Sequence, residues 1–372
     1  MRDERVDRLA RTVVTYSLGL QRGDTVLIEL RGLGTLDFGA ALVREAVAVG
    51  AVPQVFFNDE RFLRPFLLGC DEAQVVRLGD LQAAAMSLVD AYVGVRGSDN
   101  PYDLSDVPAV ARDWYQRHVW QRVHVENRAK RTRWVVLRWP NDAMAQAAGT
   151  SREAFEDFYF DVCGLDYARL GAGMRLLAER MRATRDVRVV APDTDLRLSI
   201  AGMPAVVCDG HHNLPDGEVY TAPILDSVEG TIRFNAPVLY AGRAFDDIAL
   251  RFERGRVVEA RAADDRQTTD LNRVLDTDAG ARSVGEFALG LNRALRRPMR
   301  DALFDEKIAG SLHLALGNAY DTAFNGNRSA VHWDLVLIQR PEHGGGEVWF
   351  DGELIRKDGR FVPADLAEAL DA

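Results

Sequence analysis

The stretch Thr25-Val-Leu-Ile-Glu-Leu30 decides the fold class of the first half of the chain. Its nearly continuous apolar run, the length of one strand, is typical of a strand buried on both faces of a sheet. A helical pattern precedes it, in which apolar residues recur at Val6, Leu9, Val13, Val14 and Leu18. A second helix is expected over 38–49. The stretch therefore predicts a strand inside a helix-covered sheet.

Similar strands are expected on both sides of further helical segments, at 52–57, 90–95 and 133–138. Strands that alternate with helices of this length form a mostly parallel sheet with helices on both faces. Two helices are expected from about 151 to 183, since Thr150-Ser-Arg-Glu153 places a hydroxyl ahead of a glutamate, as a capping box does.

The second half of the chain has a different pattern of short, period-two strands between Gly or Asp turns, at 187–190, 196–200, 231–234, 248–252 and 257–261. The fold class is therefore α/β. It comprises an N-terminal, mostly parallel α/β domain over residues 1–184 and a C-terminal, mixed and largely antiparallel α+β domain over residues 185–372.

Composition limits the function classes. The chain has 372 residues, 47% of them hydrophobic and 27% charged, so it can bury a large core. A formal charge of -10 argues against a nucleic-acid binder, because phosphate affinity needs concentrated positive charge. Three scattered cysteines form no disulfide framework, and no apolar run approaches the roughly 18 residues of a membrane span. We expect a cytoplasmic protein without membrane contact.

Common catalytic motifs are absent from the sequence. Gly32-Leu-Gly34 follows a predicted strand, but the next glycine is Gly39, too late for a dinucleotide-binding GxGxxG turn. We interpret it as an ordinary strand-to-helix turn. The chain contains no P-loop, GxSxG elbow or HExxH helix.

Metal-ligand side chains interrupt the strands of the second half. Glu218 follows a Pro-Asp-Gly turn, Glu286 lies among small and apolar residues, and His313 begins His-Leu-Ala-Leu-Gly. His332 and Asp334 lie two apart on a predicted strand, so their side chains share one face and can converge on one ion.

The charges of these residues favour metal binding. If Glu218, Glu286 and Asp334 cluster in a dry pocket, their charges repel unless cations or protons compensate them. Two divalent ions would do so, while both histidines supply neutral nitrogen ligands and Tyr320 a phenol oxygen. Mixed imidazole and carboxylate ligands suit Zn, Co or Mn.

Several segments spread over the whole chain are similar to segments of one protein family: 16–29, 143–149, 155–158, 163–166, 215–223, 305–306, 313–317 and 332–334. They resemble the thermophilic metallo-aminopeptidase family, the aminopeptidase T group. Two departures are visible. Lys307 stands where the family usually has the Asn of Asp-Glu-Asn, and the interval from Tyr320 to His332 is short, which bears on the substrate cleft.

The resemblance implies a set of metal ligands for two divalent ions: Glu218, Glu286, His313, Tyr320, His332 and Asp334. It implies a homodimeric aminopeptidase in which water acidified by both ions attacks the first peptide bond of a peptide or an amide-bearing small molecule. We expect Glu286 to handle the proton and Tyr320 to stabilise the oxyanion, as catalytic residues.

Other functions stay open at this point. His313, His332 and Asp334 alone match the two-histidine, one-carboxylate set of non-haem Fe(II) oxygenases, and 2,5-dihydroxypyridine dioxygenases resemble this peptidase family. Glu218 and Glu286 have no use in such a triad. A catalytically silent relative and a binding module that holds no metal are the remaining alternatives.

Overall fold

The computed structural model describes residues 3–100, 102–240 and 242–371, and the chain forms two compact units. The N-terminal unit comprises Met1–Gly164 and Gly210–Leu214, and the C-terminal unit comprises Leu165–Asp209 and Pro215–Ala372. The first unit thus ends earlier than the predicted domain limit at residue 184. The reason is that the helix expected to end there packs on strands of the C-terminal unit.

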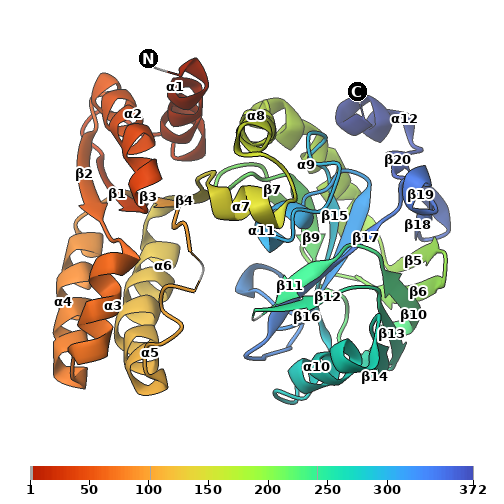
Figure 1. Ribbon diagram of the computed structural model, residues 1–372. Coiled ribbons are helices and arrows are strands. Elements are labelled where there is room, and N and C mark those ends of the chain that lie inside the picture. The colour runs from red at the N-terminus through yellow and green to blue at the C-terminus, as the bar shows by residue number, and fades with distance from the viewer. Residues whose placement is uncertain (1–2, 101, 241, 372) are drawn as a thin grey trace. The chain divides into compact units, whose positions relative to one another are not determined.

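The N-terminal unit is built on a parallel sheet, as the sequence predicts (Figure 1). Within the described residues its strand order is β2-β1-β3-β4-β8. The bounds are β1 Thr25–Arg31, β2 Val52–Phe57, β3 Ala91–Arg96, β4 Arg133–Arg138 and β8 Asn213–Leu214. The two-residue strand β8 was not predicted, because so short a segment carries no periodicity.

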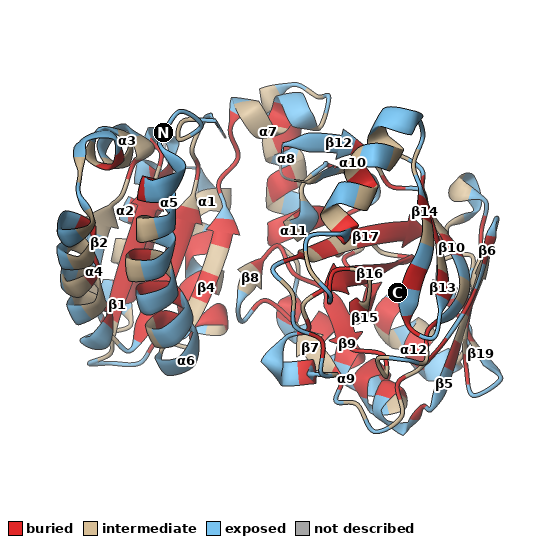
Figure 2. Cartoon of the chain, turned by 90° about the horizontal axis from the view of Figure 1, so that it is seen from below, coloured by how far each residue is buried: buried red, intermediate tan, exposed pale blue. Residues whose placement is uncertain are grey.

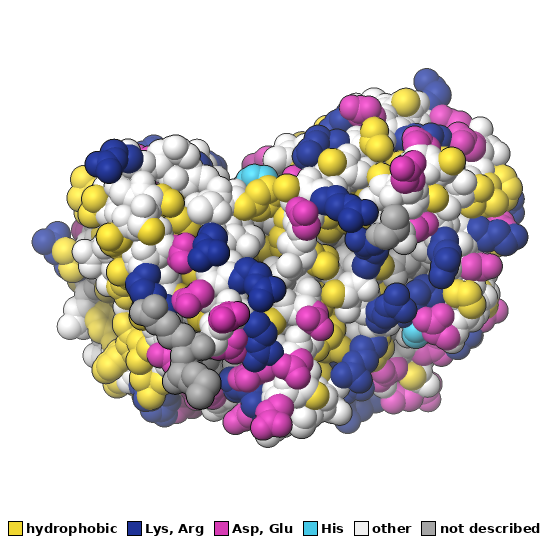
Figure 3. Space-filling view, turned by 90° about the horizontal axis from the view of Figure 1, so that it is seen from above, with side chains coloured by type: hydrophobic (Ala, Val, Ile, Leu, Met, Phe, Trp, Pro, Cys, Tyr) yellow, Lys and Arg dark blue, Asp and Glu magenta, His cyan; other side chains and the backbone are white. Residues whose placement is uncertain are grey.

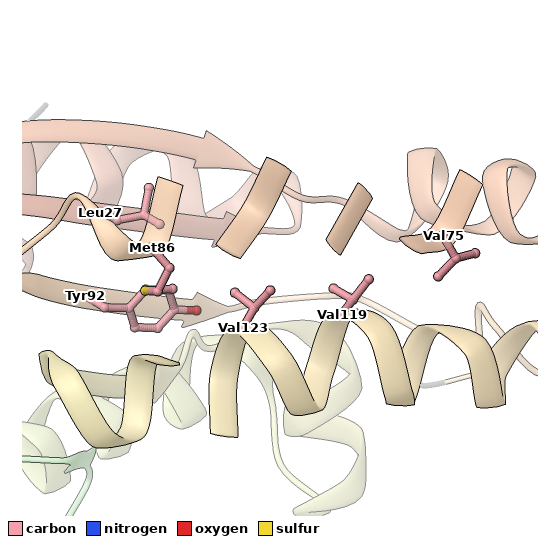
Figure 4. Close-up of a cluster of buried hydrophobic side chains, with 6 residues drawn as sticks. All are labelled: Leu27, Val75, Met86, Tyr92, Val119 and Val123. Carbon is pink, nitrogen blue, oxygen red and sulfur yellow. The ribbon is translucent and has the colours of Figure 1, made fainter. Parts of the chain in front are cut away.

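Helices cover both faces of this sheet. The helices of the unit are α1 Glu4–Arg11, η1 Thr12–Ser17, η2 Leu33–Thr35, α2 Leu36–Ala48, α3 Glu60–Gly69, α4 Glu72–Ser87, α5 Ala109–Tyr115, η3 Gln116–Arg128, α6 Ala129–Arg131, α7 Asp142–Ala147 and α8 Arg152–Cys163. On one face, side chains of the sheet and of α4 and η3 meet in a buried cluster (Figure 4): Leu27, Val75, Met86, Tyr92, Val119 and Val123.

Two local features refine the sequence interpretation. Gly32 has a φ of +85°, and a Cβ there would lie 2.1 Å from the carbonyl oxygen of Gly97, so this turn requires glycine for close backbone approach. At α8 the N-cap is Ser151, whose hydroxyl accepts from the backbone N–H of Ala154, rather than Thr150 of the predicted capping box.

The C-terminal unit holds two larger antiparallel sheets. Within the described residues one sheet has the order β14-β13-β10-β6-β5-β18-β19-β20. Its strands are β5 Asp186–Ala191, β6 Thr194–Ser199, β10 Glu229–Phe234, β13 Ile248–Glu253, β14 Arg256–Arg261, β18 Glu347–Phe350, β19 Glu353–Lys357 and β20 Arg360–Phe361.

The other sheet has the order β17-β16-β15-β9-β7 and is largely buried (Figure 2). Its strands are β7 Val206–Cys208, β9 Glu218–Thr221, β15 Val284–Gly290, β16 Ser311–Gly317 and β17 His332–Ile338. The remaining elements of the unit are β11 Val238–Tyr240, β12 Arg243–Phe245, α9 Tyr167–Ala183, α10 Asp265–Leu275, α11 Ala302–Asp305, α12 Ala364–Leu366, η4 Asp321–Ala323, η5 Pro341–His343 and η6 Ala367–Asp371.

The surface carries interspersed charges. Figure 3 shows basic and acidic side chains mixed over the face that it presents, in line with the composition. Of the helices in the described part of the chain, none has the length and apolar character needed to cross a membrane.

Candidate metal centre

Except for Tyr320, the predicted donor residues lie on neighbouring strands of the β17-β16-β15-β9-β7 sheet. Glu218 begins β9, Glu286 lies in β15, His313 lies in β16, and His332 and Asp334 begin β17. Segments that are far apart in the sequence therefore contribute side chains to one part of one sheet.

The strand register directs these donors to one face. His313 pairs with Ala288, two residues from Glu286 on β15, and Ala315, two residues from His313, pairs with Asp334. Because side chains on a strand alternate between faces, residues two apart and their register partners share a face. All the predicted protein donors on these strands fall on that face.

His313 is fully buried and lies at the centre of the group. Its Nε2 is 3.0 Å from Oε1 of Glu286, 3.5 Å from Oε2 of Glu218 and 3.9 Å from Oδ1 of Asp334. On the other side of the ring, Nδ1 lies 3.2 Å from the carbonyl oxygen of Glu306. A carbonyl oxygen only accepts, so Nδ1 is the donor and Nε2 faces the carboxylates.

His332 is oriented in the same way. Its Nδ1 donates to the carbonyl oxygen of Asn318 at 2.8 Å, and its Nε2 is 3.5 Å from Oδ1 of Asp334. Backbone carbonyls thus orient both imidazole rings with Nε2 toward the carboxylates, which is the usual arrangement of metal-binding histidines.

Tyr320 lies just beyond β16 and is more peripheral than the other predicted donors. Its ring centroid is 4.5 Å from that of His332 and 6.0 Å from that of Tyr220, and 47% of the residue is exposed. The tyrosine therefore borders the donor group at a solvent-accessible side.

Two further residues in the group, Glu306 and Lys307, were not predicted as site residues. Carboxylate or imidazole atoms of Glu306, His313 and Asp334 all lie within 4.8 Å of one another. The buried ammonium of Lys307 donates to Glu218 at 2.8 Å and also to Glu306, and it lies 4.0 Å from Asp216. The sequence signal was the lysine in the Asp305-Glu-Lys307 motif.

A glycine lets these residues reach the group. A Cβ at Gly290 would lie 2.3 Å from the carbonyl oxygen of Ile308 and 3.0 Å from that of Glu306. The backbone of 306–308 therefore crosses directly over β15, and this close approach holds Glu306 and Lys307 beside Glu218.

Burial and charge shift the pKa values of the group in opposite directions. Burial lowers the pKa of His313, but its hydrogen bond to Glu286 and the charge of Glu218 raise it to about 9. Burial raises the pKa of Glu286 above its ordinary value. Burial raises the pKa of Asp334, but the nearby charge of His332 lowers it more, so that this pKa lies well below the ordinary range. Strong mutual perturbation of this kind is typical of functional sites.

Three carboxylate oxygens in the group accept no hydrogen bond from any described residue: Oε2 of Glu218, Oε2 of Glu286 and Oδ1 of Asp334. Buried polar atoms are normally satisfied, so these atoms point to a missing partner. Together with the two imidazole nitrogens they form a mixed nitrogen and oxygen donor set, which fits a divalent transition metal such as zinc.

The comparison with protein families agrees with this donor chemistry. A family model described as thermophilic metalloprotease (M29) matches residues 2–361. The chain belongs to this family. It is accordingly a hydrolase of a metallopeptidase family, and the resemblance noted in the sequence is confirmed.

Several relatives of this M29 chain are named aminopeptidases. Aminopeptidase T of Thermus aquaticus is 28% identical, and the alignment covers 97% of both chains. Aminopeptidase PepS of Streptococcus thermophilus is 26% identical over 97% of this chain and 96% of its own. Aminopeptidase T of Thermus thermophilus is 38% identical over 41% of this chain, which corresponds to 38% of the relative's length.

Solved structures of the same architecture confirm the predicted α/β fold class. AmpT from Thermus thermophilus superposes with a TM-score of 0.79 at 27% identity, over 96% of this chain and 99% of that one. A 2,5-dihydroxypyridine dioxygenase from Pseudomonas putida has a TM-score of 0.63 at 14% identity, over 99% of both chains, which shows a shared fold alone.

Proposed function

We propose that this M29 chain is a metal-dependent aminopeptidase that hydrolyses N-terminal residues from peptides with two divalent ions. The observation that carries the proposal is a set of three buried carboxylate oxygens that accept no hydrogen bond from the described residues and face the Nε2 atoms of His313 and His332. The names of the full-length relatives support the choice of an N-terminal peptide bond.

The charges around the donor set support two ions. Lys307 is the ammonium in contact with Glu218 and Glu306, and Asp216 lies within ion-pair distance of it. Together with Glu286 and Asp334, five carboxylates and one ammonium surround the centre, so two divalent ions bring the total charge to zero. We propose as ligands Glu218, Glu286, His313, Tyr320, His332 and Asp334, with Zn, Co or Mn as the metal.

Divalent ions, when bound, acidify water toward neutral pH and polarise a carbonyl group. Within this setting, Glu286 is suited to take the proton of the attacking water and pass it to the leaving amine, because burial favours its protonated form. Tyr320, at the exposed side beside His332, is suited to donate its hydroxyl hydrogen to the oxyanion.

Iron-dependent ring cleavage is the alternative function. His313, His332 and Asp334 do converge, and the dioxygenase from Pseudomonas putida shares the fold. An iron triad does not use Glu218 and Glu286, whose Oε2 atoms lack hydrogen-bond donors among the described residues. These two glutamates favour the peptidase.

Metal counting on the purified protein tests the proposal, paired with release of free amino acid from dipeptides and aminoacyl anilides. We expect up to two transition-metal ions per chain, and hydrolysis that a chelator stops and Zn or Co restores. Oxygen uptake with Fe(II) and a dihydroxypyridine, without peptide hydrolysis, would establish the alternative. Activity unaffected by complete metal removal would exclude both.

The predicted homodimer and the cytoplasmic location stay predictions. Closed two-fold dimers are the commonest soluble assemblies, and the family resemblance implies one here. Light scattering on the eluting protein measures the mass directly, and a monomer mass would contradict the dimer.

A further inference from the structure

Arginines end three neighbouring strands of the parallel sheet in the N-terminal unit. Arg31 ends β1, Arg96 ends β3 and Arg138 ends β4. The register pairs Arg31 with Arg96 and Arg96 with Arg138, so the three residues lie side by side across the sheet. Like charges at directly paired positions repel, which makes this row unfavourable unless something compensates it. Such a departure from local preference is typical of a functional site.

The row of arginines opens onto a cavity inside the same unit. The cavity has a volume of about 280 Å³, and its polar lining includes Arg31, Arg96, Arg138, Ser98, Glu60 and Asp103. It is large enough for a small metabolite, and all the residues that line it belong to the N-terminal unit.

Glu29, a buried carboxylate beside the row of arginines, already accepts hydrogen bonds. Oε1 of Glu29 accepts from Arg31 at 2.9 Å, and Oε2 of Glu29 accepts from the hydroxyl of Tyr92 at 3.0 Å. Glu60, in turn, accepts from Ser98 at 2.6 Å and has its other oxygen 3.9 Å from Arg31. Both carboxylates therefore compensate Arg31 first.

Arg96 has no carboxylate within 4.0 Å among the described residues, and its guanidinium instead lies 5.3 Å from the ring centroid of Trp120. Burial, and next the charge of Arg31, lower the pKa of Arg96. Nearby Arg128 stacks over Trp134 at 4.2 Å, and its Nε and Nη1 find no hydrogen-bond acceptor among the described residues. Arg96 and Arg128 thus have no carboxylate partner within 4.0 Å among the described residues.

The topology also marks this edge of the sheet. In the order β2-β1-β3-β4, the chain moves outward from β1 to β2 in one direction and from β3 to β4 in the other. Ligands of open parallel sheets bind outside the carboxyl ends of the strands where the order reverses, which here lies between Arg31 and Arg96.

We propose that this cavity is a binding site for a small oxyanion, a phosphate or carboxylate group of a metabolite, recognised by Arg31, Arg96 and Arg138. Guanidinium groups offer paired N–H donors that match such anions, and a bound anion removes the repulsion within the row. Glu60 and Asp103 in the same lining orient the ligand, because its anionic group is directed toward the arginines and away from the carboxylates.

Calorimetric titration of the full-length protein tests this site, with inorganic phosphate and acetate as separate probes at constant ionic strength in chloride. We expect one anion bound at the cavity per chain and at least a tenfold weaker Kd in Arg96→Gln. Arg77→Gln is the matched control, because Arg77 lies on α4 of the same unit with a 74% exposed side chain. It should bind the anion as the wild type does.

Phenylglyoxal labelling of the wild type, read out by mass spectrometry, covers the case in which Arg96→Gln does not fold. The bound anion should slow modification of Arg96 but not of Arg77. Protection by phosphate alone assigns the site to phosphate groups, and protection by acetate alone assigns it to carboxylates. Absence of protection by both, or equal anion affinity in wild type and folded Arg96→Gln, would overturn the site. If the anion binds only at the metal centre, wild type and Arg96→Gln will bind it with equal affinity, because the substitution leaves that centre intact.

Discussion

The ammonium of Lys307 lies 2.8 Å from Oε1 of Glu218, and both side chains are buried. Oε1 of Glu218 is thereby held by a protein cation, while Oε2 accepts no hydrogen bond from the described residues. Lys307 thus satisfies one oxygen of this carboxylate, and the other is left for the proposed ions. Lys307 supplies positive charge at the position where the aminopeptidase T group usually has a neutral asparagine.

Lys307→Asn should make the metal-free protein less stable and its affinity for divalent ions higher. Removing one partner of a buried ion pair costs about 3–5 kcal/mol, and loss of the ammonium removes repulsion toward incoming cations. Thermal unfolding with and without added Zn measures both effects. Lys357→Asn is the control, because Lys357 is exposed and pairs with Glu347 at 3.3 Å. An equal Zn-induced rise in Tm in wild type and Lys307→Asn contradicts the prediction.

Glu286→Gln should abolish hydrolysis while peptide binding is largely retained. The amide preserves the shape of the side chain but cannot accept the proton, and general acid–base groups contribute about 10²–10⁴-fold to rate. Steady-state kinetics and peptide titration separate kcat from binding. Glu259→Gln, on the edge strand β14 and with a 42% exposed side chain, should keep the wild-type rate. Full activity in Glu286→Gln would remove this residue from the mechanism.

Gly290→Ala should destabilise the fold and weaken metal binding together. The added Cβ meets the carbonyl of Ile308 at 2.3 Å, so the backbone that carries Glu306 and Lys307 must move. Overpacking of this kind costs about 1–3 kcal/mol. Urea unfolding and metal titration measure the two effects. At Gly69, within α3, a Cβ meets no described atom within 4 Å, so Gly69→Ala should be neutral or slightly stabilising.

The protein should lose stability as the pH falls from 6.5 to 4, because His124 is buried in the N-terminal unit. Burial is the main cause that lowers its pKa from 6.5 to about 4. The charge of Glu29 raises the pKa, and the charges of Arg128, Arg31 and Arg96 lower it. Between pH 6.5 and 4 the unfolded chain therefore binds a proton at this histidine that the folded chain does not bind. The free energy of unfolding, which has its full value above pH 6.5, declines by about 3 kcal/mol over this range.

His124→Phe, which keeps an aromatic ring between Tyr92 and Trp120, should flatten the pH dependence of stability over this range. Urea unfolding at pH 4.5, 5.5 and 7 gives the slope for both proteins. If the variant keeps the slope of the wild type, another group is responsible.

The sequence was sufficient for the strands whose apolar runs are continuous. Residues 25–30 and 133–138 lie in β1 and β4, since a buried parallel strand needs apolar side chains on both faces. The unit limit at Gly164 was not predicted, because contacts of α9 with distant strands decide it and no local pattern encodes them.

The candidate site was predictable as residue types and not as an arrangement. His332 and Asp334 share a face by spacing alone, whereas the approach of Glu218 to His313 depends on a strand register that the sequence does not reveal. Lys307 was visible as a departure from the family motif. Its contact with Glu218 follows from the path of the backbone over Gly290, which only the structure provides.

The donors on β9, β15, β16 and β17 have a consequence for how the protein matures. A slip of one residue between two of these strands turns the side chains of one strand to the opposite face, and the group is lost. A partly folded chain accordingly offers no complete chelate. Ion uptake comes after correct strand pairing, and the captured ion then locks the pairing that made its capture possible.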